Sequence, residues 1–207
     1  MADLPQSVID RVTRLLTDGS RTLLGVAGAP GSGKSTLAMA IQAHFPADTQ
    51  VVPMDGFHLA NVELARLNLA HRKGAPDTFD AAGYLNLLQR IKSQRTEEVI
   101  YAPEFDRALE EPIAGAIAIK SGTKLLITEG NYLLLEQPPW CNARELFDEV
   151  WFVDVDDALR RGRLVQRHIR FGRSNEEALR WVETTDEPNA RRIQQTRHRA
   201  DWAVSLS

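Results

Sequence analysis

Among its 207 residues the sequence has a single cysteine, Cys141. One thiol excludes an internal disulfide and any cluster of thiolate metal ligands, and it fits a reducing compartment. Long hydrophobic runs are also missing: the longest unbroken apolar stretches are about five residues, against the roughly 20 that span a bilayer. The amino-terminal stretch MADLPQSVIDRV carries acids and a proline, with no apolar run of signal-peptide length. We therefore expect a cytoplasmic protein that is neither exported nor inserted into a membrane.

Extremes of composition are absent too. Hydrophobic residues make up 43% and charged residues 26%, which excludes collagen-like, low-complexity and wholly disordered chains. The length predicts one domain over residues 1–207. Net charge is −3, yet the segment from Arg160 to Arg199 holds eleven arginines against five acids, a local +6 that leaves −9 elsewhere. Such a basic segment indicates either a polyphosphate ligand or nucleic acid.

Apolar runs alternate with segments of helical period, which predicts an α/β fold with a mainly parallel sheet flanked by helices. The middle region, from Asp106 to Lys120, has no clear pattern. Helices are expected at Val8 to Leu16, at about Lys34 to His44, and around Tyr84 to Ile91. Strands are expected at Thr22 to Ala27, Val51 to Met54, Val99 to Ala102, Leu125 to Thr128, Val150 to Val155 and Trp202 to Leu206.

Between the first predicted strand and the helix that follows it stands GAPGSGKS, residues 28–35, a full match to G-x-x-x-x-G-K-[ST]. Glycines let main-chain N–H groups approach phosphate oxygens, and the helix presents its positive dipole end to the same anion. The lysine of the motif reaches the β- and γ-phosphates, and its serine hydroxyl ligates Mg²⁺. We expect ATP and Mg²⁺ as cofactors, bound by Gly28, Ala29, Pro30, Gly31, Ser32, Gly33, Lys34, Ser35 and Thr36.

Two classes of P-loop protein are disfavoured, because the sequence contains neither an NKxD tetrapeptide for guanine nor an LSGGQ-like signature. Polar clusters instead occupy predicted strand ends, where open α/β sheets bind their ligands. They read MDGFH at 54–58, RKGAPDTFD at 72–80, YAPEFDR at 101–107 and TEGNYLLL at 128–135.

In these motifs the sequence resembles the P-loop kinases of the uridine kinase, phosphoribulokinase and bacterial pantothenate kinase superfamily, most nearly the fructose transport system kinases among them. The resemblance runs from about Leu23 to Asp201. It implies ATP-dependent phosphorylation of a hydroxyl on a small polar metabolite, with a sugar as first choice and pantothenate or a nucleoside as second. The longer amino-terminal part of pantothenate kinases is missing, and the nucleoside-recognising positions of uridine kinases find no match. A nucleotide-sensing regulator that transfers nothing to a metabolite is the alternative from another class.

Two carboxylates are candidates for the chemistry of transfer. Asp55 follows a predicted strand and resembles the catalytic aspartate of the family, which accepts the proton of the substrate hydroxyl. It could instead cap a helix or ligate Mg²⁺ through water. Glu129 ends the apolar run LLIT in the place of a Walker-B-type acid, unless it is a capping residue. We expect Ser35, Glu129 and Asp55 to hold the metal ion.

The basic segment contains a predicted helix, residues 157–173, with arginines 160, 163, 167 and 170 on one stripe. In related kinases this region resembles a lid that closes over ATP, here at about 157–175. That resemblance indicates Arg167 and Arg173, with Lys34 and Asp55, as catalytic, and Arg170 as a nucleotide contact. The alternative is a solvated arginine face neutralised by Glu176 and Glu177. Nucleic acid is disfavoured, because no aromatic platform interleaves with the arginines.

Substrate selection is expected from polar residues within the family-like motifs. Aspartate and arginine bind vicinal hydroxyls through paired hydrogen bonds, and an analogue that lacks one leaves a buried group unpaired. A surface or structural use is the alternative for each residue. A homodimer is compatible with the sequence. The candidates are His58, Arg72, Lys73, Asp106, Arg107 and Tyr132.

Overall fold

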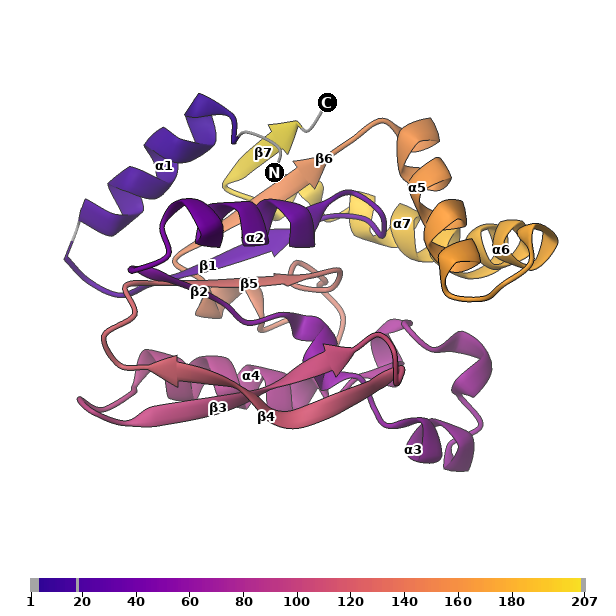
Figure 1. Cartoon of the computed structure of the whole chain (residues 1–207), viewed down its shortest axis with the longest axis horizontal. Helices are drawn as coiled ribbons and strands as arrows, with labels where there is room; N and C mark the ends of the chain where they lie inside the picture. Colours follow the sequence, from indigo (N-terminus) through magenta and orange to yellow (C-terminus); the bar gives the residue numbers. More distant parts are fainter. Residues whose placement is uncertain (1–3, 18, 206–207) are drawn as a thin grey trace.

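A five-stranded parallel sheet forms the centre of the protein, whose computed structural model describes residues 4–17 and 19–205. The strand order is β2-β5-β1-β6-β7, and every adjacent pair is parallel (Figure 1). The expected parallel sheet is therefore confirmed. The strands are β1 (Thr22–Ala27), β2 (Thr49–Val51), β5 (Leu125–Gly130), β6 (Glu149–Asp154) and β7 (Trp202–Ser205).

Helices cover both faces of this sheet. The helices are α1 (Gln6–Thr17), α2 (Lys34–His44), α3 (Asn61–Arg66), α4 (Ala81–Lys92), α5 (Asp157–Arg170), α6 (Asn175–Trp181) and α7 (Glu187–Gln194). Successive side chains of β1 point to opposite faces of the sheet, so the core consists of two clusters. Leu24 packs with α1 and α2 on one face, and Leu23 packs with α4 on the other. In the described part of the chain no helix has the length and apolarity needed to cross a membrane.

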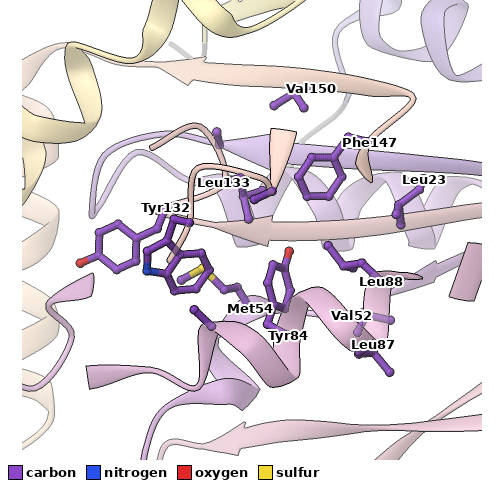
Figure 2. Packing of buried hydrophobic residues seen from close by; sticks show 14 of the residues in the cluster. Leu23, Val52, Met54, Tyr84, Leu87, Leu88, Tyr132, Leu133, Phe147 and Val150 are labelled. Atoms are coloured by element: carbon purple, nitrogen blue, oxygen red, sulfur yellow. The ribbon is translucent and has the colours of Figure 1, made fainter. Parts of the chain in front are cut away.

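The core cluster that contains Leu23 packs between the sheet and α4. Tyr84 of α4, Met54 and Leu133 are among its residues (Figure 2). The Tyr84 hydroxyl is buried and forms a 2.8 Å hydrogen bond with Thr128 Oγ1, which anchors α4 to β5 one residue before Glu129. This contact fixes the strand end on which the polar side chains stand.

A separate antiparallel hairpin carries the region that had no clear sequence pattern. β3 (Val99–Asp106) pairs with β4 (Glu111–Lys120), and the register shifts between Ala102 and Glu104. Most of β4 is exposed, so its sequence lacks the alternation of a half-buried strand. The hairpin belongs to a sheet of its own and lies below the main sheet in Figure 1.

Several predicted boundaries shift for local reasons. The strand expected at 51–54 ends at Val51, and Met54 opens a 3₁₀ turn, Met54–Phe57, after the extended residue Pro53. The helix expected at 157–173 ends at Arg170, because Gly172 adopts φ 96° and Ser174 begins α6 with a capping box. Leu206, expected in the last strand, lies outside the described residues.

Candidate active site

The phosphate-binding loop follows β1 and leads into α2. Gly28, Gly31 and Gly33 have φ values of 154°, 79° and 96°, which side-chain-bearing residues rarely adopt. Space is equally restrictive at Gly31, where a Cβ would lie 2.8 Å from both the carbonyl oxygen of Arg160 and Cγ of Leu164. Glycine is therefore required here by conformation and by the close approach of α5.

Lys34 is the buried cation of this loop. Its side chain is turned inward, with the residue 7% exposed and Nζ donating to the carbonyl oxygen of Ala29 at 3.1 Å. Burial lowers the pKa of Lys34 from 10.5 to about 8, although the nearby charges of Glu129 and Asp55 oppose that change. A buried ammonium whose hydrogen-bond partner among the described residues is a single carbonyl oxygen is suited to bind an anion.

Glu129 stands at the carboxyl end of β5, next to the loop. Its Oε1 accepts a 2.8 Å hydrogen bond from Ser35 Oγ at the start of α2. Burial raises the pKa of Glu129, and the negative charge of Asp55 raises it further, while Lys34 acts in the opposite direction. Two carboxylates and an ammonium thus share one small, poorly solvated volume.

These residues fit a magnesium-bound triphosphate. The first-turn amides of α2 have no intrahelical acceptor, and the N-cap residue Gly33 has no side chain to satisfy them. Ser32 Oγ is buried without a hydrogen-bond partner among the described residues. Ser35 and Glu129 supply the hard oxygen donors that Mg²⁺ prefers, and that ion usually completes its shell with phosphate and water. Both ligand and metal therefore have complementary groups here.

Asp55 lies across the cleft from the loop, in the turn after β2. Its Oδ2 accepts a 2.6 Å bond from the guanidinium of Arg107 at the hairpin tip, and its backbone carbonyl contacts Nδ1 of His58 at 2.7 Å. Burial alone would raise the pKa of Asp55, but the positive groups around it, His58 and Arg107 foremost, bring it below the ordinary value. Asp55 is therefore a carboxylate at neutral pH, as a proton acceptor must be.

One cleft of about 970 Å³ joins these groups. It runs from the phosphate-binding loop, which points toward α5 in Figure 1, to the hairpin tip and the segment around Lys73. The predicted site residues that line it are Pro30, Gly31, Gly33, Lys34, Ser35, Thr36, Asp55, His58, Lys73, Arg107, Glu129, Arg167 and Arg173. Gly28, Ala29 and Ser32 belong to the loop but do not line this cleft.

Four predicted residues occupy other places, and their side chains have structural partners or face solvent. Asp106 accepts hydrogen bonds from the amides of Ala108 and Leu109 and so shapes the hairpin turn. Arg72 pairs with Asp77 at 3.0 Å, and the buried Tyr132 donates its hydroxyl to the carbonyl oxygen of Gly74. Arg170, predicted to contact the nucleotide, is exposed at the end of α5. None of the four lines the described cleft.

The arginine stripe of α5 is not one continuous ligand-facing surface. Arg160 is buried, its guanidinium bonded to Glu187 and to Asp157, with side-chain exposures of 3% for Arg160 and 9% for Glu187. Its charge is thus neutralised within the protein. Arg163 and Arg167 of α5 line the cleft. Arg173, which follows α5, also lines it and packs against Trp181 with Cζ 3.8 Å from the ring centroid.

Several residues that line the cleft were not predicted from the sequence. Asn131 lies inside a motif that had been singled out for its neighbours, and its position after a strand end was the available signal. The others come from the carboxyl-terminal segment, where the sequence showed only an excess of arginine. They are His168, Trp181, Thr185, Asp186 and Asn189.

A sequence model of the Phosphoribulokinase / Uridine kinase family matches residues 23–206. The chain belongs to this family. A relative from Schizosaccharomyces pombe, named "Putative uridine kinase C227.14", is 37% identical over 188 residues, covering 86% of this chain and 80% of the relative. A "Pantothenate kinase" of Mycolicibacterium vanbaalenii is 36% identical over 139 residues, 64% of this chain and 43% of that protein.

Among solved structures, a "putative fructose transport system kinase" from Silicibacter sp. TM1040 superposes with a TM-score of 0.87 at 36% identity, covering 98% of this chain and all of that one. The family confirms the expected P-loop kinase fold and makes the chain a kinase of the uridine and pantothenate kinase type. The phosphate-binding loop is accordingly its nucleotide-binding element.

Proposed function

We propose that the protein transfers the γ-phosphoryl group of ATP, with Mg²⁺, to a hydroxyl of a small polar metabolite in the cytoplasm, and that the metabolite is a sugar. The observation that carries this proposal is the position of Asp55. It lies in the same cleft as Lys34 and Ser35, as a carboxylate held by Arg107 at 2.6 Å. A protein that only senses nucleotides has no use for a base on the far side of the phosphate site.

When bound, magnesium-ATP supplies an electrophilic phosphorus whose equatorial oxygens carry the charge to be stabilised. Lys34 contributes a buried ammonium toward those oxygens, and the amides of the loop orient them. Asp55 accepts the proton of the incoming hydroxyl, which requires Arg107 to leave the oxygen it now occupies or to share it. Arg167, a cleft residue on α5, adds positive charge opposite Asp55.

Aromatic side chains support a ring-shaped acceptor. The His58 ring packs against Phe79 and Phe105, with centroid distances of 4.0 and 4.7 Å and ring planes tilted by 39° and 48°, and all three residues line the cleft. Burial lowers the pKa of His58, although the nearby charge of Asp55 opposes that change. Such a surface packs against the C–H face of a sugar. The base of a nucleoside could use the same surface, which keeps a nucleoside acceptor as the second candidate.

An acceptor screen tests this proposal. Purified protein with magnesium-ATP is offered sugars, pantothenate and nucleosides, and ADP release is followed together with the phosphorylated product by mass spectrometry. We expect a phosphorylated sugar. ATP binding by calorimetry without transfer to any compound would instead favour the regulatory alternative, and phosphorylation of pantothenate or a nucleoside would replace the sugar.

A further inference from the structure

A π-helical turn, Val182–Asp186, joins α6 to α7 beside the cleft. Such turns are rare and frequently occur at functional sites, because the wider turn displaces the side chains that follow it. Asp186 ends this turn with φ −70° and ψ −40°, a helical conformation. An N-cap residue requires an extended conformation, so Asp186 makes no capping hydrogen bond although α7 begins directly after it. Its side chain lines the cleft instead.

His168 of α5 holds this carboxylate. The ring nitrogen Nε2 lies 2.7 Å from Asp186 Oδ2, and the two side chains are 15% and 11% exposed. Because a carboxylate only accepts, Nε2 is the donor. Within residues 4–17 and 19–205 no hydrogen bond goes to the other oxygen, Oδ1. One oxygen is thus fixed by the protein, and the second is left for a ligand.

Asp186 lines the same cleft as the proposed base, Asp55, and as Arg167 of α5. Burial lowers the pKa of Arg167, and the charge of Asp186 is the main influence that raises it, with Asp55 also contributing. Thr185 and Asn189 line the same wall, and in the described part of the chain their side chains form no hydrogen bond.

We propose that Asp186 and Asn189 select the acceptor by binding two hydroxyls on adjacent carbon atoms, with His168 as the positioning residue for Asp186. Free Oδ1 accepts from one hydroxyl, while the carboxamide of Asn189 accepts from or donates to its neighbour. The carboxylate also repels an anionic group at this end of the acceptor. The inference rests on the proposed kinase function and narrows its substrate to a neutral vicinal diol, a description that fits sugars.

The test measures binding separately from transfer. D-fructose, D-ribose and pantothenate, which has no hydroxyls on adjacent carbons, are titrated calorimetrically with a non-hydrolysable ATP analogue and Mg²⁺ present. Asp186→Asn should weaken binding of the sugar by about 10- to 100-fold, as expected for a lost hydrogen bond to a charged group. Glu183→Gln is the matched control: it removes the same charge from an exposed residue of the same turn and should change Kd less than twofold.

Equal affinities in these two variants, or no millimolar binding of either sugar to the wild-type protein, would overturn the inference. If a sugar binds through Asp186 but receives no phosphate, the proposed reaction fails and this site remains. If Asp186→Asn does not fold, Asn189→Ala takes its place in the titration. We expect this variant to bind the sugar about 5- to 20-fold more weakly, and an unchanged affinity would overturn the inference.

His168 is tested by its conservative replacement. His168→Gln retains a donor near the position of Nε2, whereas His168→Ala removes it. If His168 positions Asp186, His168→Ala should raise KM for the sugar while KM for ATP stays constant. His168→Gln should then have a KM for the sugar close to that of the wild type. Equal changes in both KM values would mean that His168 only supports the fold.

Discussion

Removing the buried charge of Lys34 should stabilise the nucleotide-free protein. Lys34→Met keeps the length and volume of the side chain. The pKa of Lys34 is about 8 in the folded protein and 10.5 in the unfolded chain. This difference in pKa destabilises the folded protein by about 3 kcal/mol at neutral pH. Because the variant also loses the hydrogen bond from Nζ to the carbonyl oxygen of Ala29, we expect a net gain of about 1 to 3 kcal/mol. For a chain of this size this raises Tm by roughly 2 to 12 °C.

The pH dependence identifies the cause. Between pH 8 and 10.5 the unfolded chain holds more protons than the folded one, so wild-type stability rises with pH across that window. The advantage of the variant is therefore complete below pH 8 and shrinks toward pH 10.5. Urea unfolding at pH 7 and pH 9.5 measures it, with the exposed Lys124→Met as control. An ATP analogue should raise Tm of the wild type but not of Lys34→Met. A variant less stable than wild type at pH 7, or an advantage that persists unchanged at pH 9.5, would refute the reasoning.

Three further substitutions examine other parts of the structure. Asp55→Asn should lower kcat by about 10² to 10⁴ and leave ATP affinity within about threefold, measured by steady-state kinetics and calorimetry; an unchanged kcat removes Asp55 from the reaction. Glu187→Gln should cost about 3 to 5 kcal/mol in denaturant unfolding, because Arg160 loses its buried counter-charge and keeps only the exposed Asp157. Glu176→Gln, in the exposed pair with Arg180, should cost under about 1 kcal/mol. Gly31→Ala should lower the free energy of unfolding by about 1 to 3 kcal/mol and abolish ATP binding, because the added Cβ would meet α5. The control is Gly162→Ala within α5: its Cβ meets nothing within 4 Å, so the substitution should be neutral or stabilising by up to about 1 kcal/mol.

The phosphate-binding loop and the parallel sheet could be predicted because both depend on local pattern. Eight consecutive residues, 28–35, contain all the groups of the loop, and each buried strand is a short apolar run that the sequence displays directly. The hairpin was not recognisable for the opposite reason. β4 is largely exposed, so its side chains follow no rule of burial, and its pairing with β3 is a contact that periodicity does not encode.

In the candidate site, too, the local features could be predicted from the sequence and the contacts between distant residues could not. Asp55 and Glu129 were identifiable because each stands at the carboxyl end of a strand predicted from the sequence, yet the bond between Asp55 and Arg107 joins residues 52 positions apart. The stripe on α5 predicted that its arginines share a face, but only the packing of α7 shows that Arg160 belongs to a buried ion pair. Asp186 had no sequence signal at all, because a π-helical turn changes which residue faces the cleft without any characteristic residue type.

The electrostatics of the free protein indicate how ligand binding is coupled to the reaction. Lys34 and Arg107 face Asp55 and Glu129, so two cations and two carboxylates neutralise one another before any ligand enters. If a triphosphate engages Lys34, the pull of this ammonium on Asp55 weakens, and that carboxylate becomes more basic although His58, Arg107 and Arg167 still act on it. An acceptor hydroxyl that then competes with Arg107 meets a stronger base than it would without nucleotide. If Asp55 is the base, as proposed, we expect nucleotide to bind before the acceptor, because an acceptor bound alone meets a carboxylate whose basicity Lys34 still lowers.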